Sequence, residues 1–164
     1  MQRGFTLIEM LVVVAIIGIL TTTVALTVSA SPQRSATLDA QRLATLLEAA
    51  AGEAQAGRRQ LAWTASDGGY DFLAADNSLE RTPRWQPLSE DETFHGRRLD
   101  DAVRIARVEV DGQPLPPGGL LVFRRGDPPL FRIALEASKD AAFRPIEVRG
   151  LPTGRVTVAV PGEE

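Results

Sequence analysis

The chain has 164 residues, and its 18 basic residues against 21 acidic ones give a net charge of −3. This acidic balance lacks the electrostatic footprint of a protein dedicated to binding a polyanion. The chain contains no cysteine, which excludes a disulfide framework and a zinc site made of thiolates. Beyond the first 30 residues, the rest suits one compact domain with a single modest core.

An uncharged, apolar segment covers residues 10–30. As an α-helix, a segment of this length is about 31 Å long, which is enough to cross the hydrocarbon core of a bilayer. Glu9 adjoins this segment and has no basic residue at helical spacing with which to pair. A carboxylate costs about 2.5–3.5 kcal/mol at the centre of a membrane and less near the interface. Glu9 therefore either lies among lipid headgroups or has a functional partner.

The opening of the chain combines a short basic leader that ends in Gly4, the sequence FTLIE at residues 5–9 and a long aliphatic run. This combination resembles the class III signal of type IV pilins and type II secretion pseudopilins. The resemblance implies that a prepilin peptidase in the inner membrane cleaves between Gly4 and Phe5 and methylates the Phe5 amine. It also implies that Glu9 meets the N-terminal amine of a neighbouring subunit during assembly. An ammonium group is the natural partner of a carboxylate in a helix bundle that excludes water.

A cleaved secretory signal peptide is the alternative interpretation. Arg3 would supply its n-region, the aliphatic run its h-region and residues 28–30 its small-residue cleavage site. Glu9 within the apolar region and the length of that region both favour the class III signal.

An amphipathic helix is predicted from Ser35 to a stop at Gly57, packed on a core. Pro32 cannot donate a hydrogen bond to the Val28 carbonyl, so we expect a kink or a short break before this helix. If the two helical parts are nearly continuous, residues 5–56 form a rod of about 78 Å. The apolar stripe of the second part consists of Leu38, Leu43, Leu46, Leu47, Ala50, Ala51 and Ala54.

A β-hairpin is predicted soon after Gly57. Its strands lie at residues 60–65 and 70–74, and Gly68 and Gly69 between them supply the positive φ that a tight turn requires.

The rest of the chain is predicted to form a long connection and then more strands. The connection covers the polar residues 76–100 and contains one short strand around Trp85. One N-terminal helix against antiparallel strands makes an α+β fold, a long hydrophobic helix packed on an antiparallel β-sheet domain. Further strands are expected at residues 103–110, 119–124, 130–136, 146–149 and 155–160. Core or loop-anchor positions are expected for Trp63, Tyr70, Phe72, Trp85, Phe123 and Phe131.

No constellation of residues indicates catalysis, a cofactor or a metal. His95 has no second ligand at a suitable spacing and is expected in a loop. The acidic runs at residues 90–92 and 100–101 lack the spacing of a calcium loop and are expected to be solvated. The sequence therefore predicts a protein that is not an enzyme. Three basic doublets are also expected on a solvated surface, at residues 58–59, 97–98 and 124–125.

The globular part has a hairpin after the long helix, Trp85 in a loop, LVF at residues 121–123 with Gly126, and FRIAL at residues 131–135. In these features it looks like the H-type minor pseudopilins of type II secretion. The resemblance implies a non-enzymatic subunit at or near the tip of the periplasmic pseudopilus. Such a subunit helps drive folded proteins across the outer membrane and has no cofactor.

The same resemblance implies how the chain is divided and what it contacts. Residues 1–4 are a leader removed by the prepilin peptidase, and residues 5–30 are the transmembrane and assembly part of the helix. Residues 31–57 pack on the globular domain, and residues 58–164 form a β-rich domain. The implied location is the bacterial inner membrane, crossed once, with the domain in the periplasm. The implied partners are major and other minor pseudopilins, the prepilin peptidase and the inner-membrane assembly platform.

Two rival functions come from other classes. A minor type IV pilin that binds nucleic acid in DNA uptake or pilus assembly would need a basic stripe, and its binding would fall steeply with salt. The acidic balance opposes this function, although the arginine doublets could cluster in space. A periplasmic enzyme behind a cleaved signal would need a catalytic set, and the sequence shows none.

Overall fold

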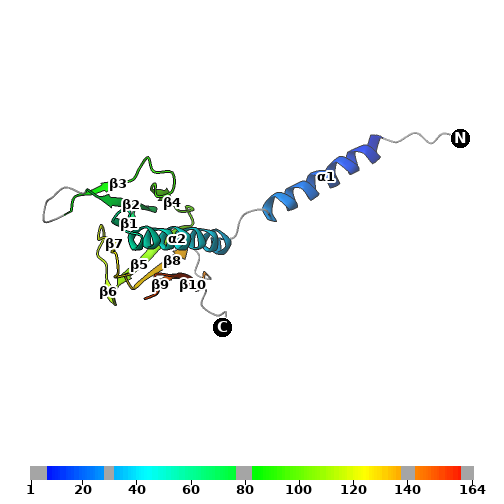
Figure 1. The fold of residues 1–164 in the computed structure, drawn as a ribbon. Helices are drawn as coiled ribbons and strands as arrows, with labels where there is room; N and C mark the ends of the chain where they lie inside the picture. The colour runs from blue at the N-terminus through cyan, green and yellow to red at the C-terminus, as the bar shows by residue number, and fades with distance from the viewer. Residues whose placement is uncertain (1–6, 28–31, 77–82, 138–142, 160–164) are drawn as a thin grey trace. The chain divides into compact units, whose positions relative to one another are not determined.

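The structure is a computed structural model that divides the chain into two compact units, Met1–Ser31 and Pro32–Glu164. The first unit contains helix α1 (Leu7–Thr27), and the second contains helix α2 (Pro32–Gln55) and the β-strands (Figure 1). The structure describes residues 7–27, 32–76, 83–137 and 143–159.

Helix α1 confirms the helix predicted over the apolar segment. Every side chain that is described in it, from residue 7 to residue 17, is exposed. In the described part of the chain, no helix has the length and apolar character that a membrane span requires. Residues 28–31 lie outside the described residues, so the kink or break near Pro32 and the continuous rod remain predictions.

Helix α2 confirms the predicted amphipathic helix. It begins at Pro32, whose fixed φ and missing N–H suit the first helical position. It ends as predicted, because Gly57 has a φ of 67° and its N–H donates to the Ala54 carbonyl. The buried face consists of Ala36, Ala40, Leu43, Ala44, Leu46, Leu47, Ala50, Ala51 and Ala54.

One residue of the predicted stripe was misplaced. Leu38 is 56% exposed, whereas Ala36 and Ala40 are fully buried. A helix turns about 100° per residue, so Leu38 lies about 200° away from each of these alanines. Two small residues therefore face the core where the prediction placed a leucine.

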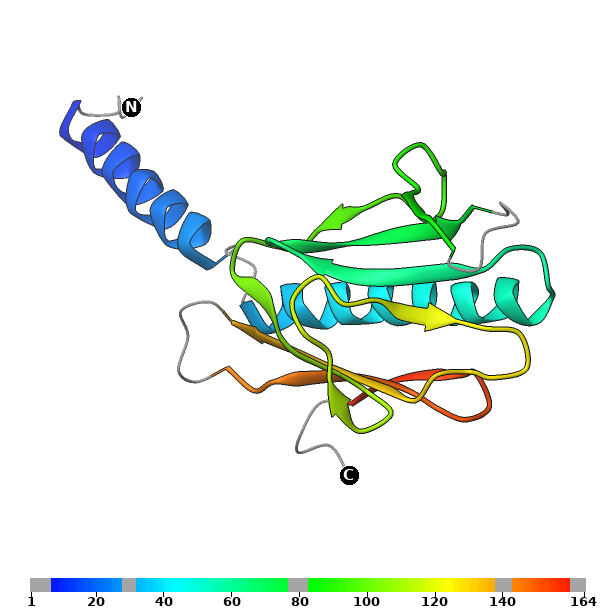
Figure 2. The same ribbon diagram turned by 90° about the vertical axis from the view of Figure 1, so that its left-hand side faces the viewer.

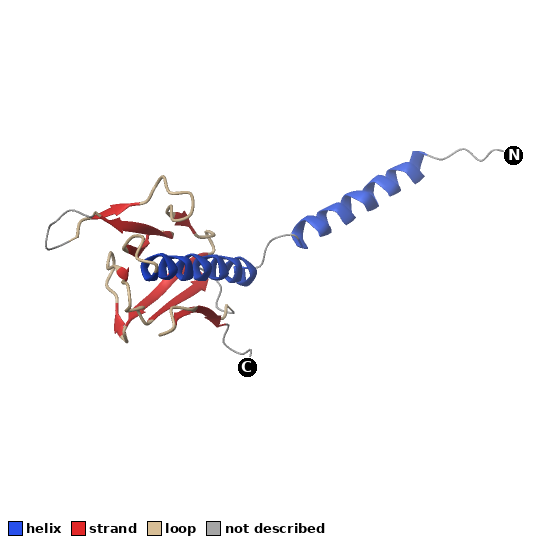
Figure 3. Ribbon diagram, in the orientation of Figure 1, coloured by secondary structure: helices blue, strands red, loops and turns tan. Residues whose placement is uncertain are grey.

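The first antiparallel sheet has the strand order β3-β2-β1-β7, and β4 also pairs with β2. Figure 3 draws all strands in red and the helices in blue. The predicted hairpin and the short strand at Trp85 are confirmed. The strand β4 was missed, since two residues show no periodicity. The bounds are β1 (Leu61–Ser66), β2 (Gly69–Ala75), β3 (Trp85–Pro87), β4 (Arg97–Arg98) and β7 (Leu121–Phe123).

The two glycines of the hairpin have different roles. Gly68 has the predicted positive φ, at 70°. Gly69 does not, so that part of the prediction was wrong; it is the first residue of β2 and pairs with Arg98 of β4. A Cβ on Gly69 would overlap the Arg97 carbonyl oxygen. Gly69 therefore permits the close approach of two strands.

The second antiparallel sheet has the strand order β10-β9-β8-β5-β6. Four of its strands were predicted to within about two residues. The fifth, β6, was missed, and it follows a tight turn in which Asp111 and Gly112 both have positive φ. The bounds are β5 (Val103–Val110), β6 (Gln113–Pro114), β8 (Phe131–Ala137), β9 (Ile146–Gly150) and β10 (Val156–Ala159).

Helix α2 packs against strands of both sheets, which lie on either side of it in Figure 2. Phe123 of β7 and Phe131 of β8 meet edge to face, with ring centroids 6.5 Å apart, and so join the sheets directly. The α+β fold is confirmed, with two antiparallel sheets in place of the single one expected. The predicted aromatic residues are buried except for Trp85, which is half-buried.

Candidate functional site

Of the residues predicted to act in processing and assembly, the structure describes Glu9 alone. Gly4 and Phe5 lie outside the described residues. Glu9 is exposed in the first turn of α1, where the N–H groups of a helix favour a carboxylate. It forms no ion pair with any described residue.

The surroundings of Glu9 are apolar. The exposed fractions of Leu7, Ile8 and Leu11 are 84%, 71% and 63%. Exposed apolar surface on this scale marks contact with a membrane or another protein. A carboxylate that loses its water in such surroundings is penalised unless a cation pairs with it.

In the globular domain, Arg59 contacts both helix α2 and the segment that contains Asp91 and Phe94. Its Nε donates to Glu53 Oε2 of α2 at 2.6 Å, and its Nη1 donates to Asp91 Oδ2 at 2.8 Å. Its guanidinium carbon lies 5.2 Å from the centroid of the Phe94 ring. The hydrogen bond to Glu53, followed by the contacts with Asp91, raises the pKa of Arg59. The prediction of a merely solvated doublet was therefore wrong for Arg59.

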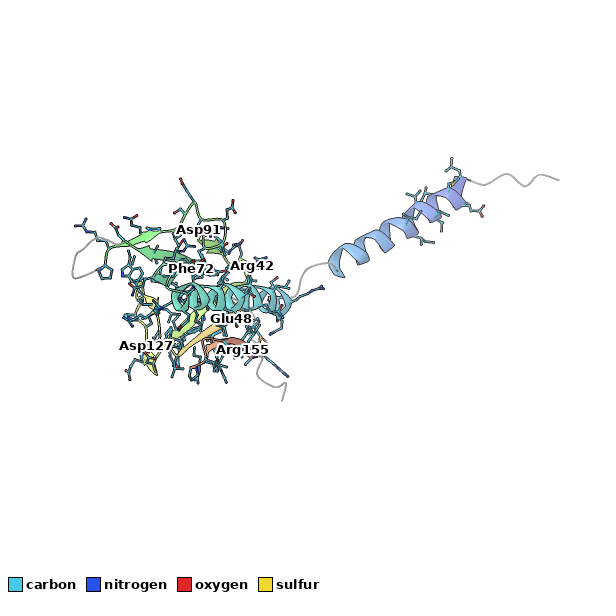
Figure 4. All side chains as sticks on the ribbon, in the orientation of Figure 1. Arg42, Glu48, Phe72, Asp91, Asp127 and Arg155 are labelled. Carbon is cyan, nitrogen blue, oxygen red and sulfur yellow. The ribbon has the colours of Figure 1, made fainter. Side chains whose placement is uncertain are left out.

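Asp91, labelled in Figure 4, also departs from the prediction of a solvated acidic run, since its side chain holds the turn at residues 91–94. Its Oδ1 accepts hydrogen bonds from the N–H groups of Phe94 at 2.8 Å and Thr93 at 2.9 Å. The Phe94 N–H, with smaller contributions from Arg59 and Thr93, lowers the pKa of Asp91. This turn places Phe94 in the core, where it is 1% exposed.

The remaining residues that could carry chemistry have structural roles. His95 lies in a loop as predicted, with its Nδ1 3.0 Å from the Asp91 carbonyl oxygen. Asp100 forms part of a turn, because its side chain accepts from the Ala102 N–H. Its own N–H donates to Asp39 of α2 at 3.0 Å. Among the described residues, no group of three histidine, aspartate or glutamate side chains could hold a metal ion.

Charges of both signs alternate on the outer face of the second sheet. Arg132 of β8 lies 3.8 Å from Glu109 of β5 and 3.7 Å from Glu147 of β9. Arg104 and Glu136 form another cross-strand pair, at 3.2 Å. These exposed pairs fit a solvated sheet face, where each contributes little stability.

The arginine doublets do not form one stripe. Those at residues 58–59 and 124–125 meet just beyond the end of α2. The doublet at residues 97–98 is β4, which pairs with the start of β2 at the opposite end of β1. The three doublets thus do not form a continuous basic track of the kind that a long nucleic acid would follow.

Sequence reasoning missed the contacts of Arg59, and it left open whether the arginine doublets cluster in space. Glu53 lies six residues before Arg59, but Asp91 lies 32 residues after it. No local pattern links residues at such separations, so the sequence contained no signal for these contacts.

Comparison with known proteins identifies relatives of both parts of the chain. Residues 1–25 match the family model of the prokaryotic N-terminal methylation motif. In an alignment of 175 residues, the chain is 30% identical to type II secretion system protein H of Pseudomonas aeruginosa. The alignment covers 96% of this chain and 97% of that protein.

Two solved structures share the fold. Both are of the minor pseudopilin EpsH from the type 2 secretion system of Vibrio cholerae. One has a TM-score of 0.65 at 16% identity and covers 82% of this chain and 99% of that chain. The other has a TM-score of 0.60 at 15% identity, with coverages of 79% and 99%.

Proposed function

Because this chain belongs to the type II secretion system protein H family, we propose that it is a minor pseudopilin, a structural subunit of the type II secretion pseudopilus. It occupies a position at or near the tip of that filament and helps drive folded proteins across the outer membrane. It performs no catalytic step. The observation that carries this proposal is the 30% identity over 96% of the chain.

The first step in this role is processing. The prepilin peptidase removes residues 1–4 by cleavage between Gly4 and Phe5, and the new Phe5 amine is methylated. The match of residues 1–25 to the methylation motif supports this step. Glycine before the cleaved bond supports it too, since a side chain there would hinder the approach of a protease to the backbone.

Before assembly, the processed subunit lies in the inner membrane with its globular domain in the periplasm. The exposed apolar side chains along α1 support this placement. The inner-membrane assembly platform then passes the subunit into the filament, where α1 contacts major and other minor pseudopilins.

Glu9 guides that transfer. Its carboxylate, which has no partner among the described residues, pairs with the methylated Phe5 ammonium of a neighbouring subunit. In a water-excluding bundle of helices, this pairing removes the penalty that an isolated carboxylate would suffer. A subunit in the correct register satisfies both charges, and a misplaced subunit leaves both unpaired.

Replacement of Glu9 tests the role in assembly. We expect Glu9→Ala to be processed normally and to fall at least about tenfold in sheared pseudopili, as measured by immunoblot against the membrane fraction. Glu9→Gln, which keeps the shape and loses the charge, should behave in the same way. Normal incorporation of either variant would contradict the assembly role.

The intact mass of the protein from a host that has the prepilin peptidase tests the processing step separately. A chain that starts at methylated Phe5 supports the pseudopilin role. A chain that starts at Ser31 would indicate a secretory signal peptide and overturn the proposal.

A further inference from the structure

A cluster of arginines borders a surface depression of about 390 Å³ just beyond the C-terminal end of α2. The cluster consists of Arg58, Arg124 and Arg125, which we name the α2-end patch. Arg58 follows the helix, whereas Arg124 and Arg125 follow β7, so the tertiary structure alone brings them together. None of the proposed steps of processing or filament assembly uses these side chains.

Contacts within the domain hold the patch in place. The Gly57 turn ends α2 next to Arg125, whose Nη1 lies 3.2 Å from where a Cβ on Gly57 would be. Gln55 Oε1 of α2 accepts a hydrogen bond from the Gly126 N–H at 3.2 Å. The loop after β7 is thereby tied to the helix end, which keeps the backbone of Arg124 and Arg125 close to that of Arg58.

The floor of the depression is apolar and the rim is polar. Ala54 and Phe123, which line it, are 3% and 1% exposed. Gln60 and the arginines supply the polar groups around this floor. Because these two side chains present little surface, the accessible groups of the depression are mainly polar, and it suits a charged peptide segment.

The charge of the patch is not neutralised within the described residues. Arg59, the fourth arginine at the depression, is already paired with Glu53 and Asp91. The arginines of the patch are exposed and form no ion pair with any described residue. Asp127, the acidic residue nearest to Arg125 in the sequence, also forms no ion pair with a described residue. Adjacent like charges repel one another, so a bound anion would relieve this repulsion.

We propose that the α2-end patch binds an acidic segment of another protein. Carboxylates can form paired hydrogen bonds with the planar guanidinium groups of the patch. A nucleic acid fits less well, because the patch is confined to one spot and Phe123 is too buried to stack on a base. This proposal is independent of the position of the subunit in the filament.

The test measures binding of a fluorescently labelled peptide of ten glutamates to the full chain in neutral detergent, by fluorescence anisotropy at low and at physiological salt. We expect the wild type to bind this peptide and not a matched peptide of ten glutamines. The triple variant Arg58→Glu, Arg124→Glu, Arg125→Glu should bind the peptide at least about tenfold more weakly. Arg98→Glu, which changes an exposed arginine at the other end of β1, should stay within about twofold of the wild type.

The melting temperature of each variant separates lost binding from lost folding. If the triple glutamate variant does not fold, the triple glutamine variant replaces it and should show the same loss of binding. No binding of the glutamate peptide by the wild type would overturn the proposal, as would equal binding by the triple variant. Displacement of the peptide by a lower concentration of duplex DNA would also overturn it, in favour of a nucleic-acid ligand. Each of these failures leaves the outcome of the Glu9 experiment unchanged.

Discussion

Helices α1 and α2 have similar lengths, 21 and 24 residues, but differ in how much of their described apolar surface is buried. Helix α2 buries one face against two sheets of its own chain. In α1, all side chains described, at residues 7–17, are exposed and most are large and aliphatic. Tertiary packing stabilises most protein helices, and exposed apolar surface on this scale is typical of a contact with a membrane or another protein. The proposed function assigns that contact to α1.

The strongest test of this contrast is truncation of leucine in α2. Leu47 is fully buried, so Leu47→Ala should lower the free energy of unfolding by about 2–5 kcal/mol, because it removes apolar contacts and leaves a cavity. Urea unfolding followed by tryptophan fluorescence measures the domain by itself, since both tryptophans, Trp63 and Trp85, lie in it.

Two control variants complete that experiment. Leu38→Ala in α2 and Ile16→Ala in α1 change residues that are 56% and 50% exposed. Each should change the free energy of unfolding by at most about 0.5 kcal/mol. A large effect of Ile16→Ala would show that α1 packs on its own domain and would remove the contrast between the helices.

A second test compares glycines of the sheet and of the helix. A Cβ on Gly69 would overlap the backbone of β4, so Gly69→Ala should destabilise the domain by about 1–3 kcal/mol. Gly52 in α2 has open space around its Cβ position. Gly52→Ala should therefore stabilise the domain, by up to about 1 kcal/mol, through higher helix propensity. If Gly69→Ala does not lower the melting temperature, the tight packing of β4 against β2 is wrong.

Arg59 and Arg58 provide a third, smaller comparison between adjacent residues. Arg59→Met leaves Glu53 and Asp91 without their shared cation and should cost about 1–2 kcal/mol in urea unfolding. Arg58→Met removes an exposed arginine without an ion pair to a described residue and should change stability by at most about 0.5 kcal/mol. Equal costs would mean that the Arg59 contacts do not hold the connection to α2.

The smallest expected effect is a dependence of the free energy of unfolding on pH in the acidic range. Asp91 has a lowered pKa, chiefly because the Phe94 N–H hydrogen bonds to its carboxylate. Its contribution to stability is therefore complete above the ordinary aspartate pKa of about 3.9 and is lost as the pH falls through the lower pKa of the folded state. Asp91→Asn keeps one oxygen acceptor but cannot ionise, so the free energy of unfolding of this variant should depend less on pH in the acidic range. An unchanged slope between about pH 5 and pH 2 would contradict the assignment.

Local pattern was sufficient for most elements of the chain. The strand Val103–Val110 was predicted at its observed bounds, and α2 was predicted to end where Gly57 ends it. Such predictions succeed because side-chain periodicity and turn residues act over a few positions. The N-terminal motif could be recognised for the same reason, since its residues are consecutive.

Contacts between residues far apart in the chain could not be predicted from local pattern. The division into two sheets, the short strand β4 and the exposure of Leu38 all depend on which surfaces meet in three dimensions. The joining of Arg59 to Asp91 and the meeting of Arg58 with Arg124 depend on it too. The strand β6 differs, because it forms a local hairpin with β5 around Asp111 and Gly112. The sequence by itself determined the helices, most strands and the family, because these depend on the spacing of residues that are close together in the chain. Only the tertiary structure decided which charges are paired and which remain available for a partner, because pairing depends on distances in space between residues far apart in the chain.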